Sequence, residues 1–478
     1  MSGRWIPRPA LAGAALLVLA GCASVSPDAQ RHAVGQWLPG RTGSVAVDPA
    51  SVGRAPDADS ARAVAELLAP PLSAEAAVKI ALLNNPGLQA SFATLQISDA
   101  DRVQASRLPN PHLAFGRLVE GDTVELERLL RFDVLGLLTL PWRLRWQEQQ
   151  NALAQLQAAQ DVIRLAADTR KAWVQAVAAQ QSADYAATAK EATEAAAELA
   201  RRMARVGNWS RYQQAKEQTQ LAEATVQLAR ARQAAFAARE RLTRLLGLWG
   251  EPAHYRLPER LPDLPASVAE STEVEARALR ERLDVRAARD QSRYVAASLG
   301  YTRATGYVNA LELSVKRNTT FDNAAGTRDS ARGWELELPL PIFDWGSARN
   351  ARAEGLYLQS AARVRDVAVR ARSEAREAWH GWRTAYDLAR HHRDEIVPLR
   401  KFIHEETVLR YNGMLLSVWD LLAETRQQAQ AVASAIDAQR DFWLADTDLQ
   451  TALTGTSPGG LLQLQAPAAG PAAASQGH

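Results

Sequence analysis

Residues 334–345, with the sequence WELELPLPIFDW, decide how the rest of the chain is interpreted. The first part of this stretch alternates between apolar residues and carboxylates, namely Trp334, Leu336, Leu338 and Leu340 against Glu335 and Glu337. A period of two predicts a β-strand with one apolar and one polar face. Pro339 and Pro341 would end it, because proline cannot donate to a ladder. Such a strand fits a membrane β-barrel with its carboxylates inside. An ordinary edge strand on a soluble helical domain explains the segment alone equally well.

The composition around this strand is that of a helical protein without disulfides. The chain has 478 residues, of which 47% are hydrophobic and 23% are charged, and alanine is used heavily. This composition favours long helices with a core of small side chains. The net charge of +3 is too small to indicate nucleic-acid binding, so no nucleic-acid partner is expected. A single cysteine excludes a disulfide framework and a cysteine metal site.

Residues 1–22 have the pattern of a secretory signal peptide. Two arginines precede a short apolar run at 11–20, which is too short to span a membrane as a mature helix. The quartet LAGC that ends at Cys22 resembles the bacterial lipobox, in which the cysteine is lipidated, and Ala23 after it resembles outer-membrane sorting. Several acyl chains on Cys22, palmitate among them, suffice for stable anchoring. The alternative is an ordinary signal peptide with an incidental cysteine.

Residues 23–72 predict a tether that leads into a first helix. The segment is rich in Pro, Gly, Ser and Asp and has little periodicity, apart from one short helix expected at 60–68. Ser73 is expected to cap the next helix, because its hydroxyl can accept from the free backbone amides of the first turn. The sequence Asn84-Asn85-Pro86 should interrupt that helix before it continues to Leu108.

Two β-hairpins are expected at matched places in the chain. Residues 338–341 (LPLP) match residues 138–141 (LTLP), so Pro141 and Trp142 should close the first hairpin as Pro341 to Trp345 close the second. The expected strands are 111–119, 132–140, 311–316 and the opening stretch, with a turn at 120–122 and a polar loop at 318–331.

A very long helix and a return helix follow each hairpin. Residues 143–206 contain neither Pro nor Gly, and roughly 60 helical residues make a rod of about 90 Å, which must lie along other helices. Gly207 is expected to end this rod in a left-handed conformation, as Gly413 is expected to end the second rod, and Ser210 should cap the first return helix. The second rod, expected at 347–411, should be bent or interrupted at Pro398.

The order of elements recurs along the chain. Residues 278–287 (ALRERLDVRA) correspond to residues 81–90 (ALLNNPGLQA), about 200 residues earlier. The predicted domains are a signal peptide at 1–22, a tether at 23–72, a first repeat at 73–250, a linker at 251–266, a second repeat at 267–455 and a disordered tail at 456–478.

These features together resemble the TolC-like outer-membrane efflux proteins, specifically their lipoprotein branch. The matching stretches are 81–86, the strand exit LPLPIFDWG at 338–346, RYNG at 410–413 and DLL at 420–422. The resemblance covers residues 72–455. The sequence departs from the pattern in having Gly306 where the first hairpin has Pro109. It also has one more residue between Gly413 and the following serine than it has after Gly207.

The resemblance implies a mainly α fold with a small β part. Long helical hairpins would form a helical barrel, and four strands per chain, from two internal repeats, would build a trimeric 12-stranded membrane β-barrel. Physical reasoning agrees, because four strands cannot close a barrel and open strand edges are excluded from lipid.

The implied function is that of an outer-membrane channel, the exit duct of a tripartite efflux system. It would be lipid-anchored, with its helical part in the periplasm. It would passively conduct small solutes received from an inner-membrane pump and a periplasmic adaptor. A heavy metal of the copper type or a drug is the implied cargo, set by the partner pump.

The candidate functional residues lie at three places. Periplasmic tips that bind the adaptor are expected at Val206, Gly207, Asn208, Tyr411, Asn412, Gly413 and Met414. A membrane girdle is expected at Trp142, Trp334 and Trp345, which Trp146 could join unless it packs within the helices. Asp420 and Glu424 would form a gate, a ring of carboxylates that favours cations. Alternatively, both carboxylates lie on a solvated helix face and pair with Arg426 or Arg410.

No enzymatic activity, cofactor or metal site is expected. The sequence lacks the G-x-S-x-G, H-E-x-x-H and P-loop motifs. His391 and Glu395 are one helical turn apart, a spacing that suits a solvated helix face better than a metal site. The rival interpretation of the whole chain is a non-conducting, lipid-anchored coiled-coil scaffold. Such a scaffold would not need alternating strands at matched places in two repeats.

Overall fold

The computed structural model describes residues 24–43, 45–268, 273–304, 310–338, 340 and 342–461. Cys22, Gly306, both prolines of the opening stretch and most of the predicted tail lie outside the described residues. The chain divides into two compact units, and each is assembled from separate stretches. Unit 1 comprises Met1–Val34, Phe92–Ala158 and Val285–Val367, and unit 2 comprises Gly35–Ser91, Ala159–Asp284 and Ala368–His478.

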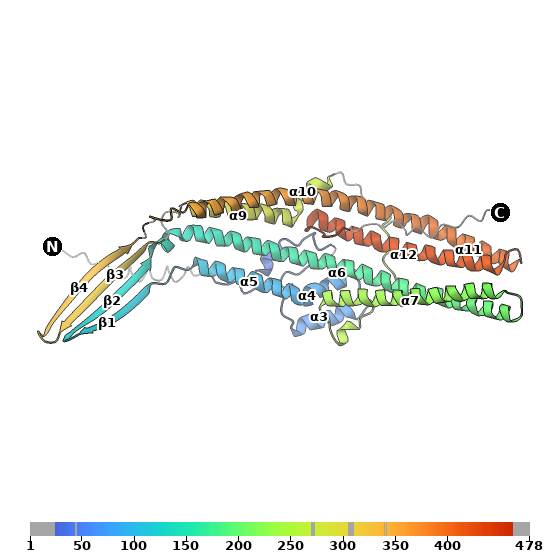
Figure 1. Ribbon diagram of the computed structural model, residues 1–478, viewed down its shortest axis with the longest axis horizontal. Helices are drawn as coiled ribbons and strands as arrows, with labels where there is room; N and C mark the ends of the chain where they lie inside the picture. The colour runs from blue at the N-terminus through green and yellow to red at the C-terminus, as the bar shows by residue number, and fades with distance from the viewer. Residues whose placement is uncertain are drawn as a thin grey trace. The chain divides into compact units, whose positions relative to one another are not determined.

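Unit 1 contains a four-stranded antiparallel sheet in the order β1-β2-β3-β4 (Figure 1). The strands are β1 His112–Glu120, β2 Thr123–Asp133, β3 Glu312–Asp322 and β4 Thr327–Glu337. Gly121 (φ 57°) and Gly326 (φ 62°) lie in the two hairpin turns, where glycine adopts positive φ without strain. β1 and β4 each have one partner, so both edges of the sheet are open within the described residues.

The expected second strand of the first hairpin, at 132–140, is wrong from residue 134 onward. β2 ends at Asp133, whose Oδ1 accepts a hydrogen bond from the Gly136 amide at 2.7 Å. A carboxylate in this position satisfies a free amide of a first helical turn, and helix α6, Val134–Arg205, begins there. Pro141 therefore lies inside α6 and does not close the hairpin. The apolar residues of this stretch fit helical spacing as well as alternation.

The predicted polar loop at 318–331 is also wrong, because most of it is strand. It forms the ends of β3 and β4 next to their turn, with Thr319 opposite Ser330. Ladder hydrogen bonds use backbone groups and need no apolar side chains, so a polar composition does not prevent pairing. β4 stops at Glu337, and Leu338 and Leu340 follow the strand as exposed residues.

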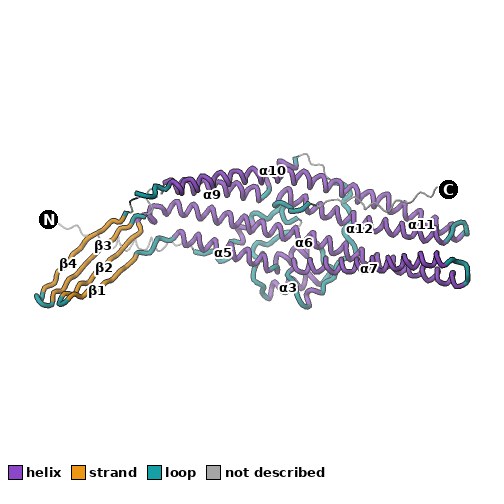
Figure 2. Tube along the Cα trace, in the orientation of Figure 1, coloured by secondary structure: helices purple, strands orange, loops and turns teal. Residues whose placement is uncertain are grey.

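The helices of unit 1 run from both hairpins. α5 (Pro86–Ser106) and α6 flank the first hairpin, and α9 (Leu283–Ala304) and α10 (Ser347–His391) flank the second, with parts of α5, α6, α9 and α10 belonging to unit 2. Figure 2 distinguishes these helices from the strands. Arg303 in α9 pairs with Glu354 in α10 at 2.5 Å, which joins the helices before and after the second hairpin.

Unit 2 is helical and has its own core. Leu72, Ile80, Leu242 and Leu246 are fully buried in it, and the indole of Trp173 donates to the carbonyl of Leu72 at 2.7 Å. Its remaining helices are α3 Ala58–Leu68, α4 Ala74–Asn84, α7 Arg211–Leu246, α8 Val274–Glu281, α11 Val397–Asn412 and α12 Val418–Thr454, with a 3₁₀ turn at Glu251–Ala253. A short helix, α2 (Arg31–Gly35), ends where unit 2 begins.

The interruption predicted at Pro398 is confirmed. A π-helical turn at His392–Ile396 separates α10 from α11, and Pro398 lies in the first turn of α11. Proline has no amide to donate and crowds the preceding turn, and the wider π turn relieves that conflict. The predicted caps at Ser73 and Ser210 also accept hydrogen bonds from first-turn amides.

Part of the predicted tether packs against the helices. Within unit 1, the Ser26 amide donates to Oδ2 of Asp99, a buried carboxylate, at 2.7 Å. Within unit 2, the Gly53 amide donates to the carbonyl of Leu82 at 3.1 Å, and Val52 is buried. Apolar residues scattered among Pro and Gly are enough to cover helix surfaces without any periodic pattern.

Two matched helix breaks, between α4 and α5 and between α8 and α9, contact the ends of the return helices α7 and α12. At the first break, Asn84 Nδ2 donates to the carbonyl of Leu246, in the last turn of α7, at 3.1 Å. At the second, the Leu283 amide donates to the carbonyl of Gly455, just after α12, at 2.9 Å. The last carbonyls of a helix have no partner within it, so both breaks satisfy groups that would otherwise be unpaired.

Candidate functional site

The register of the sheet gives it two unlike faces. Cross-strand partners lie on one face and successive residues alternate. The apolar face carries Leu130 of β2, the residues paired with it across the sheet, and every second residue along each strand from these. It consists of Leu113, Phe115, Arg117, Val119, Val124, Leu126, Arg128, Leu130, Phe132, Leu313, Val315, Arg317, Thr319, Phe321, Arg328, Ser330, Arg332, Trp334 and Leu336. This face has no carboxylate.

The opposite face, called the acidic face here, concentrates the carboxylates of the sheet. They are Glu120, Glu125, Glu127, Asp133, Glu312, Asp322, Asp329, Glu335 and Glu337. Arg131 lies 3.1 Å from Glu312, and Lys316 pairs with Glu335 across β3 and β4. The cations of this face are thus neutralised locally, and the excess is strongly negative. A surface of this kind attracts cations and repels anions.

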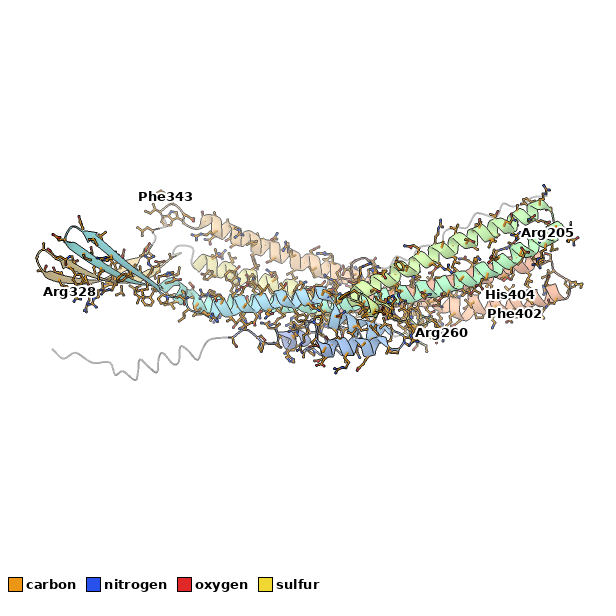
Figure 3. All side chains as sticks on the ribbon, turned by 90° about the horizontal axis from the view of Figure 1, so that it is seen from below. Arg205, Arg260, Arg328, Phe343, Phe402 and His404 are labelled. Carbon is orange, nitrogen blue, oxygen red and sulfur yellow. The ribbon has the colours of Figure 1, made fainter. Side chains whose placement is uncertain are left out.

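The predicted girdle tryptophans are all exposed. Trp334 lies on the apolar face of β4, Trp142 on α6 and Trp345 shortly before α10. Trp146 has a partner instead, since its ring centroid lies 6.0 Å from that of Tyr294 in α9. Phe343, beside Trp345, is 99% exposed and was missed in the sequence (Figure 3). Its place among prolines outside any expected element gave no reason to single it out.

The first predicted tip, Val206-Gly207-Asn208, joins α6 to α7. Gly207 has φ 79°, and the Asn208 amide reaches back to the carbonyl of Met203 at 3.0 Å. This is the left-handed helix ending predicted from the sequence. Val206 is 70% exposed at this end, next to Arg205 (Figure 3).

The second predicted tip, at residues 411–414, joins α11 to α12 with a different backbone. Gly413 has φ −77°, and Met414 has φ 60°, so a left-handed glycine at 413 was a wrong prediction. α11 continues through Asn412, which moves the reversal one residue further. The Leu415 amide then closes the turn on the carbonyl of Arg410 at 2.8 Å. Met414 is 94% exposed.

This difference predicts opposite responses to substitution at the two tips. Gly207→Ala should cost about 1 kcal/mol, because a left-handed residue with a Cβ is strained; open space surrounds that Cβ, so no clash contributes. Gly413→Ala should be close to neutral, since its φ is ordinary and its Cβ would meet no atom nearer than 3.5 Å. Met414→Gly should stabilise the second tip. Thermal unfolding measured by circular dichroism tests this, and equal destabilisation by both alanines would contradict it.

The two predicted gate carboxylates have separate partners. Asp420 belongs to the first turn of α12, where its Oδ2 accepts from the amide and hydroxyl of Ser417 at 3.1 and 2.6 Å. These hydrogen bonds lower the pKa of Asp420, so it is ionised at neutral pH. The side chain of Glu424 is only 12% exposed and lies 3.5 Å from Arg400 of α11. The sequence had offered Arg426 or Arg410 as partners instead.

Two contacts that the sequence did not predict join the hairpin α6–α7 to the hairpin α11–α12. The rings of Trp209 and Trp419 stack with centroids 4.0 Å apart and an interplanar angle of 21°. Farther from the tips, Arg426 of α12 lies 3.4 Å from Glu217 of α7, a carboxylate with 0% side-chain exposure. The sequence places a tryptophan close to each serine that caps a return helix, Trp209 beside Ser210 and Trp419 near Ser417. Nothing in the sequence indicates that these two tryptophans lie opposite each other.

A cavity of about 970 Å³ also lies in unit 2. Its wall includes four tryptophans and the carboxylate of Asp446; the tryptophans are Trp173, Trp379, Trp382 and Trp443. The indole of Trp382 donates to Asp446 at 3.1 Å, and burial raises the pKa of this aspartate. The wall includes none of the predicted tip or gate residues.

Neither a metal cluster nor a membrane helix is found in the described part of the chain. No group of three or more His, Cys, Asp or Glu side chains could hold a metal there. His391 Nδ1 lies 3.2 Å from Glu395, and both side chains are exposed. Within the same residues, no helix combines the length and the apolar character needed to cross a bilayer.

Comparison with solved structures places the fold. A membrane protein from Pseudomonas aeruginosa has a TM-score of 0.67 at 19% identity, over 83% of this chain and 94% of that chain. The outer-membrane channel CmeC of Campylobacter jejuni has a TM-score of 0.67 at 15% identity, over 81% and 87%. The outer-membrane protein VceC of Vibrio cholerae has a TM-score of 0.65 at 17% identity, over 80% and 96%. No protein-family model matches the chain, and no curated protein shows significant sequence similarity to it. The chain therefore has the fold of these membrane proteins, which confirms the TolC-like fold predicted from its sequence.

Proposed function

We propose that the protein is an outer-membrane channel, the exit duct of a tripartite efflux system. The observation that carries the proposal is the sheet of unit 1, which combines an apolar face, an acidic face and two open edges. A soluble protein would leave a large apolar surface exposed in this arrangement. In a membrane barrel, the apolar face contacts lipid and the acidic face lines a water-filled lumen.

Barrel closure requires more than one copy of the chain. Unpaired amides and carbonyls along β1 and β4 cannot be hydrated inside a bilayer. A cyclic homotrimer satisfies both edges by pairing β4 of each copy with β1 of the next, which gives a barrel of 12 strands. Cys22 carries the lipid that anchors each copy, and the helices continue on the periplasmic side.

The helical hairpins serve as the entrance of the duct. Residues 206–208 and 411–414 expose apolar side chains, Val206 and Met414 among them, that suit contact with a periplasmic adaptor. Asp420, repeated three times around the axis, provides the ring that favours cations at the narrow end. The solutes are small, their flow is passive, and their identity, heavy metal or drug, is set by the inner-membrane pump.

Planar-bilayer recordings of the purified full-length protein test this function. Wild type should insert as discrete conducting units, and chemical cross-linking in detergent should stop at three chains. Asp420→Asn removes the charge while keeping an acceptor for Ser417, so it should reduce cation selectivity with the trimer intact. The exposed Glu395→Gln, away from both tips, is the matched control. A stable membrane-bound monomer, or wild type without conductance, would refute the proposal in favour of a scaffold.

A further inference from the structure

Three arginines cross the apolar face of the sheet in one row. Arg128 of β2 is the direct partner of Arg317 in β3, and Arg317 is the direct partner of Arg332 in β4. Phe115 of β1 completes the row. Arg317 and Arg332 are exposed and Arg128 is half-buried, so all three guanidinium groups can reach the surface of the sheet.

This row is unfavourable in the isolated chain. Like charges directly opposite one another destabilise a strand pair, and the apolar face has no carboxylate to offset them. None of the three arginines makes an ion pair with any part of the chain that the structure describes. The cations on the other face are paired, Arg131 with Glu312 and Lys316 with Glu335. The difference indicates that the row has an anionic partner outside the chain.

The position of the row along the strands indicates which partner. On its helix side lies an apolar row of Leu113, Leu130, Val315 and Trp334. On its turn side the next row is mixed and consists of Arg117, Leu126, Thr319 and Ser330. Two residues of strand separate neighbouring rows, about 7 Å along the strand. An arginine at the bilayer midplane would cost about 2–4 kcal/mol, and this cost nearly vanishes at the interface. The row therefore suits the level where acyl chains meet headgroups.

We propose that Arg128, Arg317 and Arg332 bind the phosphate groups of anionic lipid in the outer leaflet of the outer membrane. This inference rests on the proposed function, which turns the apolar face toward lipid and the hairpin turns outward. Guanidinium groups bind phosphate oxygens through two parallel hydrogen bonds, and adjacent phosphates would cancel the repulsion within the row. Trp334, in the neighbouring row of β4, would lie just below the headgroups, as interfacial tryptophans do.

Two further arginines extend the same charged surface toward the turns. Arg117 lies on β1, and Arg328 lies on β4 next to the β3–β4 turn (Figure 3). The guanidinium of Arg328 sits 5.3 Å from the centroid of the Phe321 ring, which holds it against the sheet. In a trimer this surface would occur three times around the barrel, so each copy would hold its own lipid phosphates.

The test compares lipid binding by wild type and by the triple variant Arg128→Gln/Arg317→Gln/Arg332→Gln. Full-length protein in detergent is titrated with bis-phosphorylated lipid A, and bound lipid is counted by native mass spectrometry. Wild type should bind lipid A at least tenfold more tightly than the triple variant. Lys316→Gln removes a cation from the acidic face of the same strand and should bind like wild type. Should the triple variant fail to fold, the single variant Arg332→Gln on the edge strand replaces it. This variant should weaken lipid A binding several-fold.

The remaining arms separate the possible sources of the effect. Dephosphorylated lipid A should bind wild type no better than the triple variant, and inorganic phosphate at equal concentration should not displace lipid A. If the triple variant and Arg332→Gln both bind lipid A as tightly as wild type does, the inference is overturned. Displacement of lipid A by free phosphate would overturn it as well. Conductance is recorded for the same samples. If wild type conducts and the arginine variants bind lipid A as tightly as wild type does, only this inference is refuted. Absence of conductance by wild type refutes the proposed function.

Discussion

Replacement of Arg282 by methionine is expected to lower the free energy of unfolding by about 3 kcal/mol. The guanidinium is 1% exposed and contacts two carboxylates, with its Nε 2.9 Å from Asp284 and its NH1 2.8 Å from Glu374. Burial opposes its charge, but the hydrogen bonds and charges of both carboxylates raise the pKa of Arg282. Methionine fills a similar volume without charge, and it leaves both carboxylates without their cation.

Arg280, two residues earlier, provides the matched control. It lies 3.8 Å from Glu273, and both side chains are largely exposed. Arg280→Met should change the stability by no more than about 0.5 kcal/mol, because exposed ion pairs contribute little. Thermal unfolding of both variants in the same detergent measures the difference. Equal melting temperatures for the two variants would show that the buried pairing at Arg282 does not stabilise unit 2.

Much of the helical part is predictable from the sequence, because the residues that end its helices act within a few positions. Serines before helices and glycine at 207 fix helix ends through hydrogen bonds and backbone conformation within a few residues. The break at Pro398 follows from proline chemistry alone. The left-handed conformation at Met414 was not predictable in this way. It depends on α11 continuing one residue beyond the position that the first tip suggested.

The sheet was predicted only where its apolar residues alternate. The polar residues at 318–331 predict a loop, yet two strands extend into this segment, because β3 continues to Asp322 and β4 begins at Thr327. Strand pairing uses the backbone, so a strand with polar side chains on both faces leaves little trace in a sequence. The row of arginines on the apolar face became visible only from the register, which brings residues about 200 positions apart side by side.

In the proposed channel, replacement of Arg426 by alanine is expected to favour an open state. The guanidinium of Arg426 lies 3.4 Å from Oε2 of Glu217, whose side chain is fully buried and whose Oε1 has no hydrogen-bond partner in the described chain. Without Arg426, the observed packing of the two hairpins would bury an unpaired carboxylate, whereas a splayed arrangement would hydrate it. A difference of about 2 kcal/mol would change the ratio of open to closed channels roughly 30-fold. Single-channel recordings should therefore show a several-fold rise in mean conductance.

Trp419→Ala should act in the same direction, because it removes the ring stack with Trp209 that joins the same two hairpins. Arg410→Ala removes an exposed arginine near the same tip and should leave conductance unchanged. The exchange Glu217→Arg/Arg426→Glu restores an ion pair of opposite polarity. If the pair holds the hairpins together, this double variant should conduct less than Arg426→Ala, with a coupling energy measurable in a double-mutant cycle. Unaltered conductance in both Arg426→Ala and Trp419→Ala would mean that the closed state does not depend on these contacts.

The pair Arg400–Glu424 lies within one hairpin, so its loss cannot separate the two hairpins directly. An opening effect of Arg426→Ala would therefore locate the closing force between hairpins and leave Asp420 the separate role of selecting the charge of what passes.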